Sequence, residues 1–221
     1  PAPGSATGYS DELRFEREQI AIGHTGRFAS GTLESSLMRN TTETKGRTIP
    51  GDVGVAYEGF PSIVGGAPRE LETTNTVLDS KFIMPLGNHM TTLGLQWWDA
   101  ELDDGLAGET FAQTTWSLFA EDEWMLRDDL ALTLGGRYDH HDAFGSQFSP
   151  RGYLVWNTTP NWTLKGGVSR GYKTPTLNDL HDGINGVTGQ GTVLTIGNPD
   201  LEPETSTSSE IGAHYDNQQG F

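Results

Sequence analysis

The stretch LALTLGGRYDHHD, residues Leu130–Asp142, carries the clearest structural signal in this sequence. Mostly apolar residues stand at every second position, namely Leu130, Leu132, Leu134, Gly136 and Tyr138. Mostly polar residues stand between them, namely Ala131, Thr133, Gly135, Arg137 and Asp139. Side chains point alternately to the two sides of a β-strand, so the stretch predicts a strand with one apolar and one polar face.

The alternation returns in WTLKGGVSRGY. Its predicted apolar face holds Trp162, Leu164, Gly166, Val168 and Tyr172, with Arg170 as a basic misfit near the strand end. Two interpretations fit this pattern. A soluble antiparallel sheet hides its apolar face in a core, whereas a membrane barrel turns that face to lipid. Aromatic residues stand near the ends of the apolar faces, where a barrel places its interfacial girdles.

Composition excludes several classes of protein. The chain has 221 residues, a net charge of −16 and no cysteine. Phosphate contacts need a basic face, so the charge argues against nucleic-acid binding. The absence of cysteine excludes disulfides, zinc thiolates and thiol catalysis. No run approaches the roughly 18 apolar residues of a transmembrane helix, but the strands of a barrel are short and half polar.

The sequence predicts an all-β antiparallel fold with about nine strands. They cover approximately Asp11–His24, Thr32–Arg47, Leu71–Leu86, Met90–Glu101, Thr110–Leu126, Leu130–Asp142, Phe148–Thr158, Trp162–Thr174 and Ser206–Asn217. In the fifth predicted strand, Asp122 lies on the same face as the apolar residues. An acid on a lipid-facing surface is costly at mid-bilayer, so Asp122 belongs near a membrane edge if a membrane is present.

The connections between these strands alternate in length. The first, third, fifth and seventh are short, and the second, fourth, sixth and eighth are mostly longer. In a meander, alternate connections lie at opposite ends of the sheet. Transmembrane β-barrels combine short periplasmic turns with long outer loops, whereas a soluble sandwich predicts no such segregation. Bacterial single-chain barrels have an even number of strands, so we expect an interior part of a larger barrel.

Two motifs flank the longest connection: GYKTPTL at Gly171–Leu177 and GNPDLEPET at Gly197–Thr205. With GGRYD, FSPRGYLVW and WTLKGG, they resemble the TonB-dependent outer-membrane receptors, most closely the catecholate-type ferric siderophore receptors. We expect both motifs to shape the ends of the loop. Prolines cannot donate to a strand ladder and favour extended chain, which suits that position.

The resemblance implies that residues 1–221 are part of the receptor barrel domain. The family's plug domain, its TonB-contacting segment and the remaining strands are not visible in this sequence. It also implies a Gram-negative outer-membrane location, with lipid and lipopolysaccharide as neighbours. The expected function is uptake of ferric siderophores, energised through TonB, with the ferric siderophore as transported ligand and no bound cofactor.

A ferric catecholate is anionic and aromatic, so its site needs basic groups for charge and rings for stacking. Candidates at the loop ends of the strands are Arg47, Tyr57, Phe60, Arg69, Trp98, Arg170, Tyr172 and Lys173. Trp97 and Trp98 are adjacent, so at most one of the two faces the lumen.

Other chemistries have weaker support in the sequence. His140 and His141 in DHHD diverge on a strand, so they predict no metal site. His181 lies between the two loop motifs, as a ligand histidine does in haem receptors of the same family, which keeps a haem receptor open as an alternative. No GxSxG or HExxH motif is present, and no enzyme is predicted. A soluble acidic β-protein that binds carbohydrate through exposed tryptophans is the other alternative.

Overall fold

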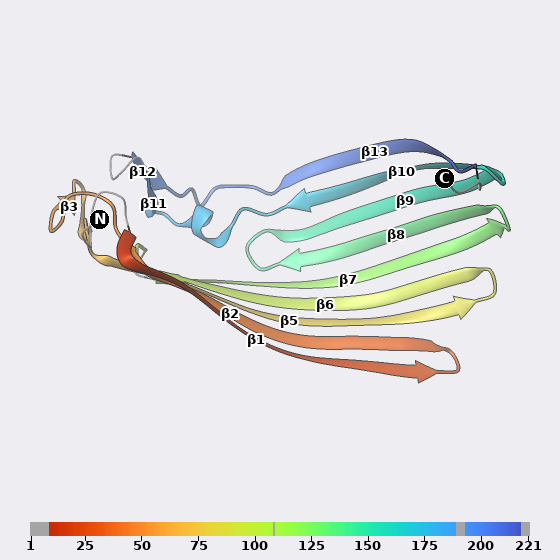
Figure 1. Cartoon of the computed structure of the whole chain (residues 1–221), viewed down its shortest axis with the longest axis horizontal. Coiled ribbons are helices and arrows are strands. Elements are labelled where there is room, and N and C mark those ends of the chain that lie inside the picture. Colours follow the sequence, from red (N-terminus) through yellow and green to blue (C-terminus); the bar gives the residue numbers. More distant parts are fainter. Residues whose placement is uncertain (1–8, 108, 189–192, 218–221) are drawn as a thin grey trace.

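The structure, a computed structural model, describes residues 9–107, 109–188 and 193–217. Nine long strands form one antiparallel sheet in the order β1-β2-β5-β6-β7-β8-β9-β10-β13 (Figure 1). Their bounds are β1 Tyr9–Phe28, β2 Gly31–Thr48, β5 Pro68–Leu86, β6 His89–Asp104, β7 Glu109–Arg127, β8 Leu130–His141, β9 Gly145–Thr159, β10 Trp162–Lys173 and β13 Glu204–Tyr215. The nine predicted strands are therefore confirmed, and several are longer than the sequence indicated.

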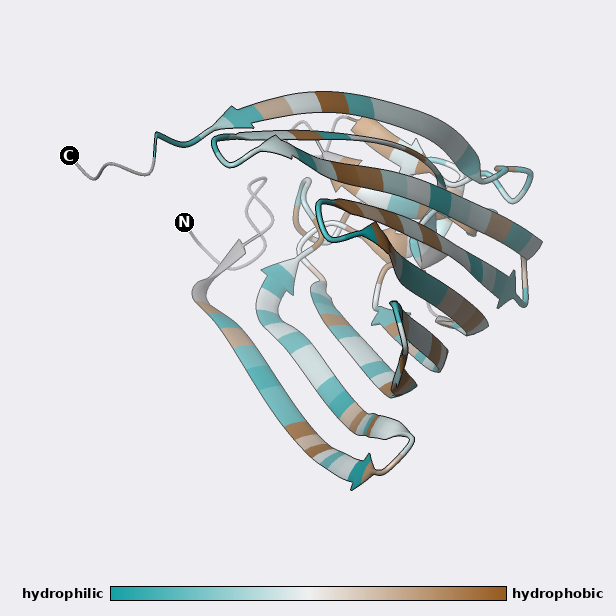
Figure 2. Cartoon of the chain, turned by 90° about the vertical axis from the view of Figure 1, so that its right-hand side faces the viewer, coloured by the Kyte–Doolittle hydropathy of each residue, from teal (hydrophilic) through white to brown (hydrophobic). Residues whose placement is uncertain are grey.

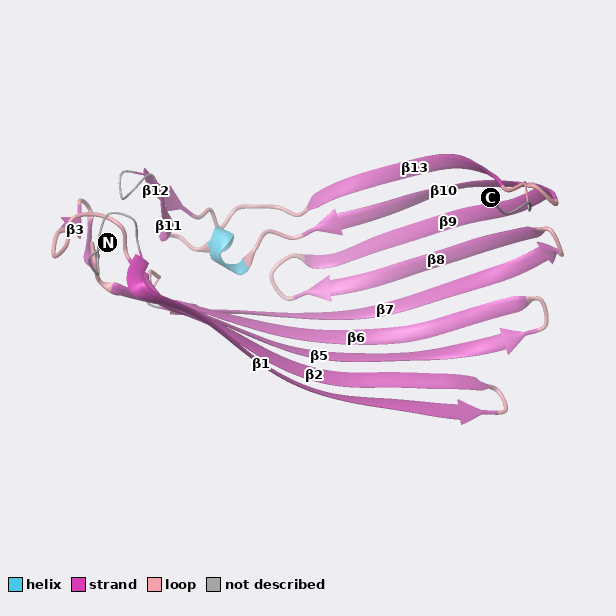
Figure 3. Cartoon of the chain, viewed as in Figure 1, coloured by secondary structure: helices cyan, strands magenta, loops and turns pink. Residues whose placement is uncertain are grey.

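The connections divide between the two ends of the sheet (Figure 3). Tight turns at 29–30, 87–88, 128–129 and 160–161 join the strands at one end. Gly87 takes a φ of +64°, which such a turn requires and glycine adopts without strain. The predicted segregation is confirmed, but the connections 105–108 and 142–144 are shorter than expected because β6 and β9 extend into them.

The two longest connections carry secondary structure of their own. Residues 49–67 contain the hairpin of β3 (Ala56–Tyr57) and β4 (Phe60–Val64). Residues 174–203 contain the 3₁₀ helix η1 (Leu177–Leu180) and the hairpin of β11 (Ile184–Thr188) and β12 (Val193–Ile196). Both hairpins lie at the end of the sheet opposite the tight turns (Figure 1).

The sheet is strongly curved (Figure 2). The side chains on its two faces differ in exposure. Apolar side chains on one face are open to the surroundings, with Ile211 97% and Ile20 74% exposed. On the other face Ser117 and Asp139 are only 1% and 4% exposed although no second layer of the described residues covers the sheet there. Side chains crowd on the concave side of a curved sheet, so the polar face is concave and the apolar face convex.

Aromatic side chains form two belts on the convex face. The belt near the tight turns includes Phe28 with Phe82, His89 with Trp124, and Trp162 with Tyr215. The belt near the longer connections includes Trp116, whose ring contacts Tyr138 and His140. An apolar band between two aromatic girdles is the surface that a transmembrane barrel presents to lipid.

Asp122 lies where the sequence predicted it, beside the belt at the tight-turn end. It is two residues from Trp124, and its carboxylate lies 2.7 Å from both His89 Nδ1 and Thr91 Oγ1. The carboxylate of Asp122 therefore has polar partners although it lies on the convex face. No helix of the described residues is long and apolar enough to cross a membrane.

Among the described residues, β1 and β13 are the edges of the sheet, which does not close on itself. An open edge exposes unpaired backbone groups, which lipid does not tolerate. The sheet therefore has the form of one wall of a barrel, as the odd number of strands predicted.

Candidate functional site

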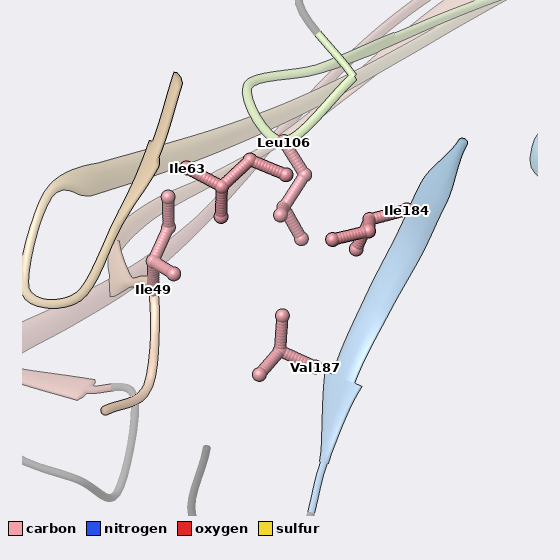
Figure 4. Packing of buried hydrophobic residues seen from close by; sticks show 5 residues of the cluster. All are labelled: Ile49, Ile63, Leu106, Ile184 and Val187. Carbon is pink, nitrogen blue, oxygen red and sulfur yellow. The ribbon is translucent and has the colours of Figure 1, made fainter. Parts of the chain in front are cut away.

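A small apolar cluster joins the longer connections above the open end of the wall. Its buried members are Ile49, Ile63, Leu106, Ile184 and Val187 (Figure 4). They come from three connections, of which the first and the last are more than 100 residues apart in the chain. We define the cap as residues 49–67, 105–107, 184–188 and 193–196. It lies beyond the loop ends of β5 and β6 (Figure 1).

A buried ion pair anchors the cap to the wall. Arg69 on β5 donates from Nε and Nη2 to the two carboxylate oxygens of Asp104 on β6, at 2.9 and 2.7 Å. The side chains of the two residues are 9% and 2% exposed. Asp104 also accepts from the backbone N–H of Leu106, and Arg69 reaches the carbonyl of Asn185 at 3.5 Å. The guanidinium predicted to meet ligand is thus committed to a carboxylate inside the protein.

Tyr57 and Phe60, the aromatic candidates in the first long connection, pack against the same cluster. The Tyr57 hydroxyl donates to the carbonyl of Pro50. Burial raises the pKa of this hydroxyl, so it keeps its proton and remains a donor at neutral pH. In this structure both rings support the cap.

The concave wall below the cap carries a polar network centred on Arg137. Its Nε donates to Asp139 at 2.7 Å, and its Nη2 donates to Gln96 at 2.6 Å and to Ser117 at 2.7 Å. Gln96 donates in turn to Asp79 at 2.6 Å. Four strands contribute to this network, so the guanidinium is held in a fixed position while its side chain stays 36% exposed.

Two predicted residues lie close to this network. Trp98 shares the concave face with Gln96, two residues before it, and its Nε1 donates to Asn75 at 2.9 Å. Tyr172 interacts electrostatically with Asp139 and Arg137. The alternation along β10 predicted Tyr172 on the apolar face, and this prediction is wrong. Pairing between β9 and β10 ends at Ser169, whereas β10 stays paired with β13 up to Lys173.

The remaining basic candidates are distributed over the loop end. Lys173 is exposed and helps to line a cavity of about 160 Å³ with Pro175, Asp179 and Leu201. Arg47 lies opposite Arg69 in the ladder between β2 and β5. Arg170 is exposed and lies opposite Thr207 in the ladder between β10 and β13. The eight candidates therefore do not converge on one point.

The two loop motifs lie together at the base of the longest connection. Lys173 and Glu204 are strand partners, and Asn198 donates its backbone N–H to Asp179 at 2.7 Å. The side chain of Asp179 also accepts from the backbone N–H of Thr176 at 3.0 Å. These contacts agree with the expectation that both motifs shape the ends of the loop.

The histidines take separate positions. His140 contacts Trp116 and Ser146, whereas His141 contacts Gln113 and Phe144 on the other face, so the predicted divergence is confirmed. The ring of His181 lies edge-on to Phe111 at 5.2 Å. Within the described part of the chain, no group of three or more His, Asp or Glu side chains is arranged to hold a metal ion.

Sequence reasoning did not single out the Arg137 network. The signal available was the pair of charges Arg137 and Asp139, two residues apart on the polar face of the strand. Their partners Gln96 and Ser117 lie 41 and 20 residues from Arg137 in sequence, and only the strand order brings them together.

Comparisons with known proteins agree with this architecture. The family described as "TonB dependent receptor-like, beta-barrel" matches residues 3–221. The iron-regulated outer membrane virulence protein of Vibrio cholerae serotype O1 is 41% identical over 158 residues, covering 69% of this chain and 24% of that protein. The ferric enterobactin receptor of Pseudomonas aeruginosa is 31% identical over 231 residues, covering 91% of this chain and 31% of the receptor.

A solved structure is similar over nearly the same range. It is a mutant ferric enterobactin receptor of Pseudomonas aeruginosa in complex with enterobactin, with a TM-score of 0.79 and 27% identity. The match covers 95% of this chain and 34% of that one. The present chain thus spans about a quarter to a third of the length of these relatives.

Proposed function

The chain belongs to the family of TonB-dependent receptor-like β-barrels, and from this premise we propose that the full-length protein is an outer-membrane receptor for ferric siderophores. The proposal describes a transporter and assigns no catalytic group. The observation that carries it is the similarity to a ferric enterobactin receptor over 91% of the chain. The convex apolar band between aromatic belts supports a location in the outer membrane of a Gram-negative bacterium.

The proposed ligand is a ferric catecholate, which is anionic and aromatic. Trp98, Tyr172 and Lys173 remain our candidates for contact, because they lie on or beside the concave wall or at its outer end. We add Arg137, whose fixed guanidinium suits a charge-assisted hydrogen bond to an anion. Arg47 is retained for its position at the loop end of β2.

Three earlier candidates have a different proposed role. Arg69, Tyr57 and Phe60 would act indirectly, by holding the cap in place at the mouth. Their support is the buried pair with Asp104 and the packing of both rings on the apolar cluster. A guanidinium already paired in a buried site gains little from a second anion.

The proposed transport cycle needs parts that lie outside this sequence. We infer that the full-length protein contains further barrel strands, a plug domain and a segment that contacts TonB, which would supply the energy for release. Lipid and lipopolysaccharide would surround the convex face. The ferric siderophore is cargo, and we propose no resident cofactor.

Quenching of tryptophan fluorescence in the full-length protein tests the ligand class. We expect saturable quenching by ferric enterobactin, with Lys173→Gln weakening binding about fivefold through loss of one charge-assisted contact. Arg127→Gln, at the tight-turn end, is the matched control and should bind as the wild type does. Saturable quenching by haem alone would instead identify a haem receptor, and quenching by neither ligand would contradict the siderophore proposal.

Extraction behaviour tests the location separately. A barrel should leave the cell envelope only in detergent, whereas a soluble carbohydrate-binding protein should extract in buffer or salt. Extraction without detergent would contradict the membrane location whatever the ligand.

A further inference from the structure

Arg137 offers only part of its guanidinium to a ligand on the concave side of the sheet. A guanidinium has two edges that can each hold both oxygens of a carboxylate or phosphate through two nitrogens. Nε and Nη2 form one edge, and Nη1 and Nη2 form the other. The contacts of Arg137 within the wall decide which of these edges a ligand can use.

The wall itself occupies the first edge. Arg137 donates from Nε to Asp139 and from Nη2 to Ser117, both at 2.7 Å. Ser117 donates in turn to the same oxygen of Asp139 at 2.6 Å, so the two acceptors lie side by side along this edge. Ser117 is 1% exposed and Asp139 is 4% exposed. Both acceptors are therefore buried, and a ligand cannot take their place.

Gln96 occupies half of the second edge. Its Oε1 accepts a second hydrogen bond from Arg137 Nη2, at 2.6 Å. The amide nitrogen of Gln96 donates to Asp79, also at 2.6 Å. An ionised carboxylate only accepts hydrogen bonds, so Asp79 fixes the orientation of the amide and leaves Oε1 as the atom that faces the guanidinium.

Nη1 is the nitrogen of Arg137 that stays available. Within the part of the chain that the structure describes, Nη1 donates no hydrogen bond. The side chain of Arg137 is 36% exposed, and its Cζ lies 5.9 Å from the centre of the Phe119 ring. An anion on the concave side can therefore be bound through one nitrogen but not through a complete edge.

This restriction affects two classes of anionic iron complex differently. A free carboxylate offers two oxygens on one carbon, and an arginine edge binds both at once. The oxygens of a ferric catecholate are already bound to iron and belong to aromatic rings, so a single donor and the face of the guanidinium can hold it. A guanidinium without a free edge therefore loses more affinity for carboxylates than for catecholates.

We propose that Gln96 is a specificity-determining residue of the receptor. By occupying Nη2 of Arg137, it favours ferric catecholates over ferric complexes with free carboxylates, such as ferric citrate. Asp79 is a positioning residue, because it acts on Arg137 only through Gln96. The inference rests on the proposed function, since it assumes that the transported anion meets Arg137.

Quenching of tryptophan fluorescence by ferric enterobactin and by ferric citrate tests the proposal in the full-length protein. We expect Gln96→Leu to free one N–H of Nη2 and to tighten ferric citrate binding about fivefold, through one added hydrogen bond. The affinity of this variant for ferric enterobactin should change less than about twofold. A general structural defect would weaken the binding of both ligands, so a gain for one ligand distinguishes the two explanations.

Two variants in the same wall separate the edge from the rest of the network. Ser117→Ala removes the other acceptor of Arg137 Nη2 but leaves Asp139 on the buried edge, so ferric citrate binding should not tighten. Gln147→Leu removes an amide that lies opposite Asp139 in the ladder and forms no hydrogen bond to Arg137. It is the matched control for the loss of a glutamine, and it should keep the wild-type ratio of the two dissociation constants.

Changes at Asp79 test the positioning role. Asp79→Leu leaves Gln96 without its orienting partner and should tighten ferric citrate binding about twofold. Asp79→Asn keeps an acceptor for the amide and should retain the wild-type ratio. Heat-modified electrophoretic mobility checks that each variant is folded.

The outcomes distinguish this inference from the proposed function. An unchanged ratio in both Gln96→Leu and Asp79→Leu would overturn the inference, and so would an equal shift in Gln96→Leu and Ser117→Ala. Failure of the wild type to bind ferric enterobactin would overturn the proposed function, and the inference with it.

Discussion

Isoleucine side chains occupy opposite environments in the cap and in the wall. Ile184 in the cap is 2% exposed, whereas Ile211 on the wall is 97% exposed. The cap buries its apolar residues from water in the ordinary way, above an ion pair that is also buried. The wall turns the same residue types outward, where lipid would cover them. Residue type alone therefore does not identify the core of this protein.

The largest expected effect comes from breaking the buried pair of the cap. Arg69→Ala leaves the Asp104 carboxylate buried without its cation, which costs about 3–5 kcal/mol. We expect hydrogen exchange in the full-length protein to accelerate in residues 49–67 and 184–188 and to stay slow in β7 to β10. Arg69→Leu combined with Asp104→Leu should recover most of the protection. Equal losses in the single and the double variant would show that the pair is not what anchors the cap.

A charge on the wall should have the next largest effect. Leu134→Arg places a guanidinium near the middle of the convex face and should cost about 3 kcal/mol in a bilayer. Urea titration of the full-length protein folded into liposomes measures this loss. Val55→Arg makes a similar change at a residue of the first long connection that is 57% exposed, and it should be nearly neutral. Similar costs at the two positions would remove the distinction between wall and cap.

A cavity made in the cap tests the same difference at a buried residue. Ile184→Ala should destabilise the cap by about 2 kcal/mol, near the low end for such a substitution because the cluster is small. Limited proteolysis of the 174–203 connection reports this loss. Ile196→Ala, on the same hairpin but 58% exposed, should leave the cleavage rate almost unchanged. Faster cleavage in Ile196→Ala than in Ile184→Ala would contradict the proposed packing.

The smallest effect concerns one hydroxyl. Tyr57→Phe keeps the ring in the cluster and removes the hydrogen bond to Pro50, so it should cost about 1 kcal/mol. The folded-state pKa of Tyr57 is raised by burial, so its contribution is complete below the unfolded pKa of about 10 and is lost as pH rises through the folded value. Proteolysis of the cap should therefore accelerate at alkaline pH in the wild type. If Tyr57→Phe accelerates equally, another group is responsible.

Local patterns predicted the wall well. Alternation depends on residues two apart, and turn lengths depend on a few neighbours, so both can be read along the chain. Asp122 is an example of a position predicted from these local patterns. Its place on the apolar face of a predicted strand, near a strand end, was enough to assign it to the edge of the band, where it lies with His89 and Thr91.

The candidate site was harder to predict because its contacts are long-range. Arg69 has the same appearance in sequence whether it meets ligand or Asp104, which lies 35 residues away on the next long strand. Tyr172 follows the alternation of its strand, yet the structure turns it toward Asp139 where the pairing with β9 has ended. Neither contact can be predicted from the residues that neighbour Arg69 or Tyr172 in the sequence.

The nine strands, their apolar and polar faces, the segregation of short and long connections, and the two loop motifs could all be predicted from the sequence. All of these depend on period-two alternation or on short segments. Two features could be seen only in the folded chain: three connections share one apolar cluster, and Arg69 is buried against Asp104. These depend on strand order and curvature, which bring together residues that are distant in the chain.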